Sequence, residues 1–213
     1  LKDMPMEIPK ELPVIAYTNR EDPRDALILK PGIQDLKEGG IIGSSSRRRS
    51  LQAGKLYPKC SFKNIRGNVQ TRLFKLEHEE YEATILALAG LKRLGMEGLV
   101  SRIFSVDEMI PSAGQGILAV QGRKGEKIPG IEAVDCSDSR FAAKAERGFV
   151  RYLNGGCTSP VAAYAETSGN EIRIRGLYYH EETGQFEAGM ISGEKHKGEI
   201  LAERLARSLK GRF

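Results

Sequence analysis

The chain has 213 residues, enough for one large or two small domains, and its 40% hydrophobic and 29% charged residues are ordinary for a globular protein. A net charge of +5 is too small to indicate nucleic-acid binding, and the longest apolar run, residues 85–89, is far too short to cross a membrane. The three cysteines lack C-x-x-C spacing and the three histidines are scattered, which argues against a disulfide framework and a metal site and favours a reducing, cytoplasmic location.

The first half of the chain predicts alternating strands and helices. Residues 41–44 read as a short buried strand, and a serine turn then opens a helix through residues 47–51 that closes near Gly54. A second strand at 62–66 precedes a helix at 69–80, and a buried central strand at 83–89 precedes a turn or short helix at 90–95. This alternation predicts a parallel α/β sheet with ligands at the carboxyl ends of its strands.

The second half predicts an α+β arrangement. A loop at 107–116 leads to a strand at 117–121, and the change in composition at 124–130 indicates a boundary. We expect a helix at 139–153, an alternating strand at 172–175, and a hairpin partner at 186–191. Residues 199–210 predict an amphipathic helix with Leu201, Leu205 and Leu209 on one face.

Positive charge is concentrated in residues 39–76, which contain nine Lys and Arg residues and no Asp or Glu. A charged stretch is usually a solvated face, but such faces normally mix signs. Within this stretch Ser44, Ser45 and Ser46 stand between a strand and a helix, where backbone N–H groups and the helix dipole favour an anion. The pattern therefore predicts an anion-binding site.

Cys157 follows a predicted helix and two glycines and is soon followed by Pro160, so its thiol is expected on a tight loop near a surface. Taken alone, such a cysteine is more readily interpreted as a small buried hydrophobe. Together with the arginines, the thiol suggests a covalently tethered polyanion. Cys60 and Cys136 have no comparable context and are interpreted as structural.

Eight short stretches resemble the porphobilinogen deaminase family, whose members build a linear tetrapyrrole in haem biosynthesis. The stretches are LKDMP (1–5), REDPRDA (20–26), GSSSRRR (43–49), RGNVQTRL (66–73), AGLKRLG (89–95), DEMIP (107–111), GQG (114–116) and GGC (155–157). One of them would be a weak signal, but together they occur in family order over nearly the whole chain. The resemblance implies a transferase that condenses porphobilinogen, with loss of ammonia, into hydroxymethylbilane.

The resemblance also implies a fold of three domains, two of them α/β and like periplasmic binding proteins, and a small α+β third domain. On this pattern residues 1–18 are a remnant of the first domain, and residues 19–112 form the α/β second domain with the arginine-rich site. Residues 113–134 return to the first domain, and residues 135–213 form the third domain with the cofactor cysteine. The rest of the first domain, the first third of the enzyme, is expected to precede this chain.

A dipyrromethane cofactor joined to Cys157 by a thioether is implied by the same resemblance. Each pyrrole unit of the substrate carries two carboxylates, and guanidinium groups pair with carboxylates through two parallel hydrogen bonds. The family pattern assigns carboxylate binding to arginines and a lysine, and hydroxyl donation to two serines. Gln115 is expected to contact the cofactor or to orient a hinge. The assigned cations and serines are Lys2, Ser45, Ser46, Arg48, Arg49, Arg66, Arg72 and Arg93.

Asp3 takes the catalytic role on this pattern. Without its LKDMP context it would be interpreted as a solvated carboxylate near a terminus. With that context, its carboxylate is expected to hydrogen-bond pyrrole N–H groups, promote the loss of ammonia and stabilise the cationic methylene-pyrrole that results. Residues 20–26 are interpreted as a hinge in which the charges around Pro23 pair locally.

Other functions remain open from the sequence. A non-catalytic anion-binding module of the same fold would need the arginines but not Cys157, and an inactive fragment of the enzyme would share both features. A nucleic-acid-binding protein that uses residues 39–76 is less favoured, because the chain has no Trp and aromatic residues make up only 7% of it. We therefore expect porphobilinogen as the partner of a monomeric protein, with neither nucleic acid nor membrane.

Overall fold

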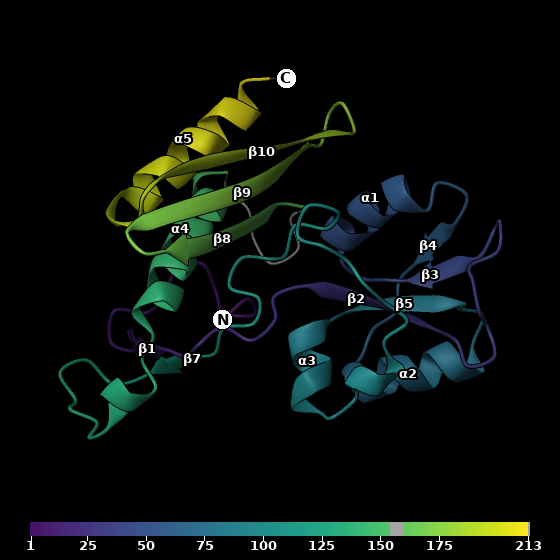
Figure 1. Cartoon of the computed structure of the whole chain (residues 1–213), viewed down its shortest axis with the longest axis horizontal. Coiled ribbons are helices and arrows are strands. Elements are labelled where there is room, and N and C mark those ends of the chain that lie inside the picture. Colours follow the sequence, from purple (N-terminus) through teal and green to yellow (C-terminus); the bar gives the residue numbers. More distant parts are fainter. Residues whose placement is uncertain (154–159, 213) are drawn as a thin grey trace. The chain divides into compact units, whose positions relative to one another are not determined.

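The computed structural model describes residues 1–153 and 160–212, which divide into two units (Figure 1). Unit 1 consists of Leu1–Glu21 and Ile110–Phe213, and unit 2 consists of Asp22–Met109. The chain therefore leaves unit 1 early, forms unit 2, and then returns to complete unit 1. The finer division into parts of three domains stays a prediction.

Unit 2 contains a five-stranded sheet in the order β4-β3-β5-β2-β6. The alternation of strands and helices predicted from residue 41 to residue 95 is confirmed, and β5 is the central strand as expected. The first helix continues past Gly54, however, and β4 is shorter than predicted. The elements are β2 (Asp25–Leu29), β3 (Ile41–Gly43), α1 (Arg47–Leu56), β4 (Ser61–Lys63), α2 (Val69–His78), β5 (Ala83–Ala87), α3 (Leu88–Arg93), η1 (Glu97–Leu99) and β6 (Arg102–Ile103).

This sheet is mixed, so the prediction of a parallel sheet was wrong for one strand. β3 is parallel to β4 and β5, whereas β2 is antiparallel to both β5 and β6. A parallel connection needs a crossover that carries the chain back along the sheet, usually a helix. Residues 30–40, between β2 and β3, contain no helix, so β3 runs opposite to β2.

Both faces of the unit 2 sheet are covered by helices. Along β2, Ala26 and Ile28 pack on one side with residues of α2 and α3, whereas Leu27 packs on the other side with Ala53 of α1. This burial on two faces explains why β2 and β5 are almost continuously apolar rather than alternating.

Unit 1 contains a two-stranded pair, β1-β7, and an antiparallel sheet in the order β10-β9-β8. The C-terminal helix, the helix preceding residues 154–159 and the β9–β10 hairpin were all predicted, although β9 and β10 extend further than expected. The helices share one core with the sheet, in which Phe149, Ile174 and Leu205 are buried. The elements are β1 (Val14–Tyr17), β7 (Ala119–Gln121), η2 (Ile131–Ala133), α4 (Ser137–Tyr152), β8 (Ala162–Ser168), β9 (Glu171–His180), β10 (Gln185–Glu194), η3 (Lys195–Lys197) and α5 (Gly198–Lys210).

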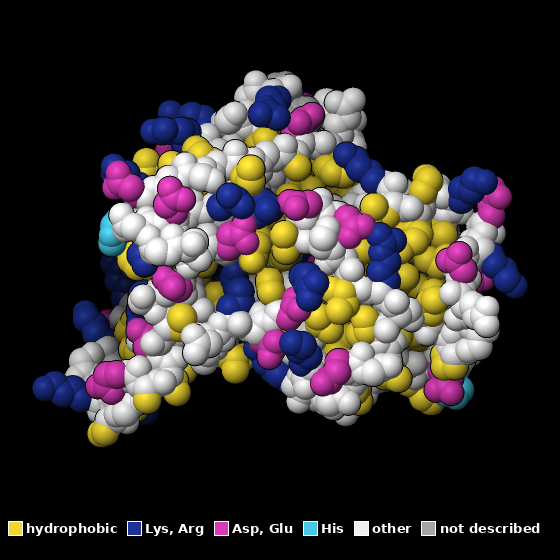
Figure 2. All heavy atoms as spheres, viewed as in Figure 1, with side chains coloured by type: hydrophobic (Ala, Val, Ile, Leu, Met, Phe, Trp, Pro, Cys, Tyr) yellow, Lys and Arg dark blue, Asp and Glu magenta, His cyan; other side chains and the backbone are white. Residues whose placement is uncertain are grey.

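Surface charges of both signs are interspersed on the face drawn in Figure 2. Within residues 1–153 and 160–212, no helix combines the length and the apolar character that crossing a bilayer requires. The same residues contain no cluster of three or more His, Cys, Asp or Glu side chains that could hold a metal ion.

Candidate functional site

The serine turn before α1 forms as predicted and caps the helix. The Ser46 hydroxyl accepts a hydrogen bond from the Arg49 N–H at 3.4 Å, and the Ser46 N–H donates to the Ser44 hydroxyl at 3.2 Å. Ser45 is exposed, and its hydroxyl donates to the Ile65 carbonyl at 2.7 Å. The N-terminus of α1 is therefore fixed by side chains of the motif itself.

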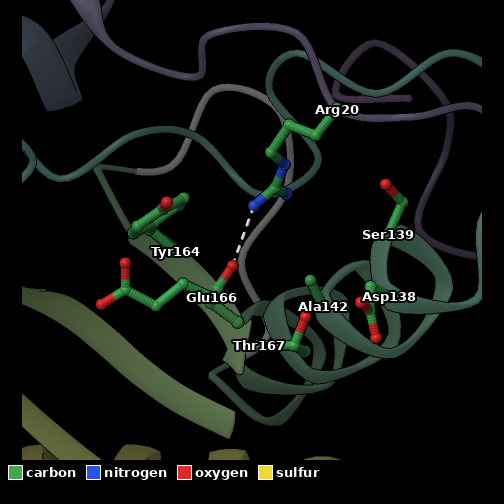
Figure 3. Close-up of a pocket in the computed structure, with 8 residues that line it drawn as sticks. Arg20, Asp138, Ser139, Ala142, Tyr164, Glu166 and Thr167 are labelled. Carbon is green, nitrogen blue, oxygen red and sulfur yellow. Dashed lines mark hydrogen bonds between the residues drawn. The ribbon is translucent and has the colours of Figure 1, made fainter. Parts of the chain in front are cut away.

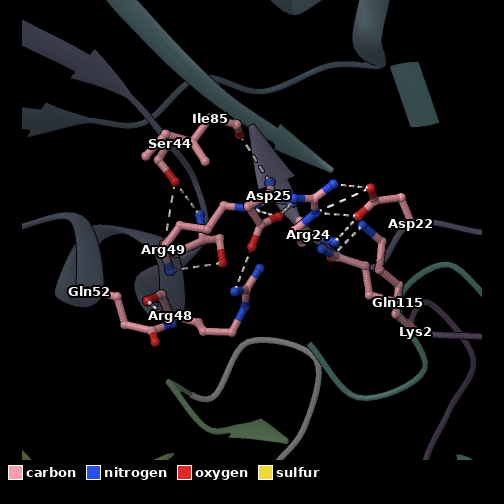
Figure 4. Close-up of polar contacts among 11 residues, drawn as sticks. Lys2, Asp22, Arg24, Asp25, Ser44, Arg48, Arg49, Gln52, Ile85 and Gln115 are labelled. Atoms are coloured by element: carbon pink, nitrogen blue, oxygen red, sulfur yellow. Dashed lines mark hydrogen bonds and ion pairs between the residues drawn. The ribbon is translucent and has the colours of Figure 1, made fainter. Parts of the chain in front are cut away.

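Arg48 and Arg49 lie on either side of one buried carboxylate, that of Asp25 (Figure 4). Arg49 donates to Asp25 Oδ1 from Nε at 3.0 Å and from Nη2 at 2.8 Å, and Arg48 Nη1 lies 2.7 Å from Oδ2. The three side chains are at most 7% exposed. The structure thus brings together two of the predicted arginines and adds an acidic partner that the sequence analysis did not assign.

The topology of the sheet explains why these residues meet. The serine turn follows β3 and Arg66 follows β4, so both lie beyond the carboxyl ends of parallel strands, and Arg93 ends the helix that follows β5. Because β2 is antiparallel to β5, its first residue, Asp25, lies opposite Ala87, the last residue of β5. The strand that departs from the predicted topology therefore places Asp25 at this same edge.

The remaining predicted arginines differ in exposure. Arg72 is half-buried, and its Nε donates to the Gly67 carbonyl at 2.8 Å. Burial lowers the pKa of Arg72, and the nearby charge of Arg49 lowers this pKa further. Burial likewise lowers the pKa of Arg48, while the Asp25 carboxylate opposes this shift. Arg66 and Arg93 are exposed.

The charged residues of segment 39–76 are all positive, but in the folded structure acidic side chains lie next to several of them. Acidic side chains from outside this segment neutralise several of its cations. The pairs are Asp25 with Arg48 and Arg49, Glu38 with Lys59 at 3.2 Å, and Glu80 with Lys63 at 3.0 Å. The positive charge available to a ligand is therefore smaller and more localised than the sequence suggests.

In unit 1 the structure brings Lys2 next to Gln115. Lys2 Nζ donates to Gln115 Oε1 at 3.4 Å, and Gln115 is only 1% exposed (Figure 4). Asp3 is exposed, and its carboxylate has no hydrogen-bond or ion-pair partner among the residues that the structure describes. Cys157 lies outside the described residues; α4, which precedes it in sequence, ends at Tyr152.

A buried ion pair between Arg20 and Glu146 was missed by sequence reasoning. Glu146 is fully buried in α4 and accepts from Arg20 Nη2 at 2.8 Å, from the Gly114 N–H at 2.6 Å and from the Ala165 N–H at 2.7 Å. Burial raises the pKa of Glu146, and the charge of Arg20 opposes this shift. A glutamate on the apolar stripe of a helix, between Ala142 and Phe149, was the available signal.

Arg20 also lines a small hollow of about 130 Å³ in unit 1 (Figure 3). Its guanidinium lies 5.3 Å from the centroid of the Tyr164 ring and donates to the Ala165 carbonyl at 2.9 Å. None of the site residues predicted from the sequence lines this hollow. Arg20 therefore attaches the start of the predicted hinge segment to α4 and β8. Within that segment, Asp22 and Arg24 pair at 2.6 Å as expected.

Two family models match the chain. The model described as "Porphobilinogen deaminase, dipyromethane cofactor binding domain" matches residues 1–128, and "Porphobilinogen deaminase, C-terminal domain" matches residues 140–211. The porphobilinogen deaminase of Ruminiclostridium josui is 49% identical over 209 residues, which are 98% of this chain and 71% of that protein. The corresponding protein of Ruminiclostridium cellulolyticum is 47% identical, and that of Alkaliphilus oremlandii is 46% identical, each over 71% of its own length.

Proposed function

The chain belongs to the porphobilinogen deaminase family, and from this premise we propose the residues through which it acts. The protein is an enzyme, a transferase of tetrapyrrole biosynthesis. The proposal is that it condenses porphobilinogen stepwise into hydroxymethylbilane on a dipyrromethane group joined to Cys157 by a thioether. Family membership does not favour the alternative of a non-catalytic anion-binding module.

The donor set at the edge of the unit 2 sheet fits a ligand that carries several carboxylates. Arg48 and Arg49 bring two positive charges to the one carboxylate of Asp25, and Arg72 adds a third nearby. Like charges held close together in a buried site are stabilised by an added anion. This excess of guanidinium groups over carboxylates is the observation that carries the proposal.

Other residues would complete the binding of the same ligand. The exposed side chains of Arg66 and Arg93 can turn toward carboxylates, and the Ser46 hydroxyl, which accepts from the Arg49 N–H, can still donate its own O–H. We propose that Ser45 contributes its hydroxyl. The family pattern also assigns ligand binding to Lys2 and Gln115.

When bound, dipyrromethane would supply the pyrrole carbon to which each new unit is joined. Asp3 would hydrogen-bond the pyrrole N–H of porphobilinogen and stabilise the positive charge that develops on the substrate as ammonia leaves. Its exposure and its lack of a partner among the described residues leave the carboxylate available for this role. The arginines would hold the acetate and propionate groups while Asp3 acts on the reacting end.

Intact-mass measurement tests the proposed covalent attachment. We expect the purified protein to carry an adduct with the mass of dipyrromethane, and the Cys157→Ser variant to lack it. Cys60→Ser is the matched control, because Cys60 is a free cysteine of unit 2 whose Sγ donates to the Lys37 carbonyl at 3.7 Å. An adduct that persists in Cys157→Ser would contradict the assignment.

A further inference from the structure

Arg147 lies on α4, next in sequence to the buried Glu146, and contacts the segment that carries Asp3. Its Nη2 donates to the Pro5 carbonyl at 2.5 Å and to the Met6 carbonyl at 2.9 Å, across 142 and 141 residues of sequence. Arg147 is only 7% exposed. Its guanidinium is thus engaged with the chain itself, through the two backbone carbonyls of Pro5 and Met6.

The position of Asp3 depends on the backbone around it, because its carboxylate has no partner among the described residues. On one side, Lys2 donates to Gln115, and the Met4 N–H donates to the Leu1 carbonyl at 3.0 Å. On the other side, Arg147 holds the carbonyls of Pro5 and Met6. The side chain of Met6 also packs against the core formed by α4, α5 and the β8–β10 sheet.

Both sides of Asp3 are thus connected to one helix. Glu146 accepts from the Gly114 N–H, which fixes the loop that presents Gln115 to Lys2. Arg147 fixes the chain after Asp3. Two adjacent residues of α4 therefore hold the two segments that flank the carboxylate.

We propose that Arg147 is a positioning residue that holds the Asp3 carboxylate in its productive place. The inference rests on the proposed catalytic role of Asp3. A charge-assisted hydrogen bond to a backbone carbonyl is stronger than a neutral one, and a single donor shared by two successive carbonyls restricts the backbone between them. Misplacement of a reacting group by about 1 Å can reduce a rate roughly a hundredfold.

The test compares single-turnover rates of porphobilinogen consumption in variants whose covalent adduct has been verified by mass. Arg147→Met keeps the length and the apolar packing of the side chain but removes its donors. We expect its rate at saturating substrate to fall roughly ten- to a hundredfold, with KM changed less than the rate. Arg147→Lys keeps the charge and a donor and should recover part of the loss. If Arg147→Met fails to unfold cooperatively, Arg147→Gln takes its place, because it keeps a polar end but removes the charge. A wild-type rate in Arg147→Gln would then overturn the proposal.

Arg151→Met is the matched control, because Arg151 lies one turn further along α4, is exposed, and pairs only loosely with Glu7, at 3.7 Å. Its rate should stay at the wild-type value. The variant Asp3→Asn/Arg147→Met should be no slower than Asp3→Asn, since Arg147 acts through Asp3. Additive losses, or an Arg147→Met rate equal to that of the wild type, would overturn this inference and leave the proposed function intact. A wild-type rate in Asp3→Asn would instead overturn the role of Asp3, and this inference with it.

Discussion

Asp25 makes it possible for two arginines to lie buried at the start of β2. Each of its oxygens faces a different guanidinium, and Arg49 also donates from Nη1 to the Ile85 carbonyl at 3.1 Å. These contacts hold both guanidinium groups in place before any ligand binds. Preorganised charges of this kind need little rearrangement when an anion arrives.

Removing the charge of Asp25 should therefore destabilise the protein strongly. Asp25→Asn would leave two buried guanidinium groups with a neutral amide, and loss of one partner from a buried ion pair typically costs about 3–5 kcal/mol. Urea denaturation measures this loss in the free energy of unfolding. Asp22→Asn is the control, because Asp22 pairs with Arg24, whose side chain is 41% exposed, and such a pair contributes about 1 kcal/mol or less. Equal losses in the two variants would show that Asp25 has no special role.

The sequence predicted the arginines of this site but not their internal partner. Residues 43–49 form a local motif, so strand, serine turn and helix could all be read from adjacent residues. The contact between Asp25 and Arg49 joins residues 24 positions apart, through a strand that was not predicted. A tertiary ion pair of this kind leaves no periodicity in the sequence.

Among the elements, helices were predicted better than sheet topology. The bounds of α4 and α5 lie within two residues of those expected, because amphipathic spacing is a local property. β2 begins within a charged motif that was interpreted only as a hinge, and the strand was not predicted. Its direction depends on the helix-free residues 30–40. Local patterns specify elements, whereas strand direction depends on the connection between them.

Two glycines of unit 1, one on β9 and one on α4, should respond to alanine in opposite directions. A Cβ at Gly176 of β9 would lie 2.4 Å from ring atoms of the buried Phe149, so Gly176→Ala forces the core to move and should cost about 1–3 kcal/mol. At Gly148 of α4 the nearest atom would be 3.9 Å away, and alanine in a helix is favoured over glycine by about 1 kcal/mol.

Thermal or urea unfolding of the two variants checks this pair. Gly176→Ala should unfold more readily than the wild type, and Gly148→Ala should be at least as stable. Stabilisation by both substitutions would mean that the Phe149 ring can move without a loss of stability. The packing of α4 on β9 would then be looser than the structure indicates.

At the scale of the whole molecule, the N-terminal segment of unit 1 is held by the part of the chain that returns after unit 2. Arg20 and Glu146 are 126 residues apart, Arg147 and Pro5 are 142 apart, and Tyr17 and Asp135 are 118 apart. Each of these contacts joins two segments of unit 1 that are separated in sequence by the whole of unit 2. The placement of Asp3 therefore depends on the folding of the C-terminal half, which no local pattern in residues 1–21 could reveal.

Asp135 connects these parts of unit 1 in a way that depends on pH. Its carboxylate accepts from the Tyr17 N–H at 2.9 Å and from Arg140 Nη2 at 2.7 Å, and the hydrogen bond from Arg140 is the main cause that lowers the pKa of Asp135 below its ordinary value of 3.8. Because the folded pKa is the lower one, the stabilisation is complete above the ordinary value and is lost as the pH falls through the folded value.

Asp135→Asn should therefore reduce the free energy of unfolding by about 1–2 kcal/mol near neutral pH, between the values typical of exposed and buried charged pairs. The difference from the wild type should shrink as the pH falls below 3.8, because Asp135 in the wild type then also becomes neutral. Urea denaturation in steps from neutral pH to the lowest pH with cooperative unfolding measures this change. A difference that stays constant across that range would show that the amide substitution acts through packing, and that the charge on Asp135 does not hold β1 to the start of α4.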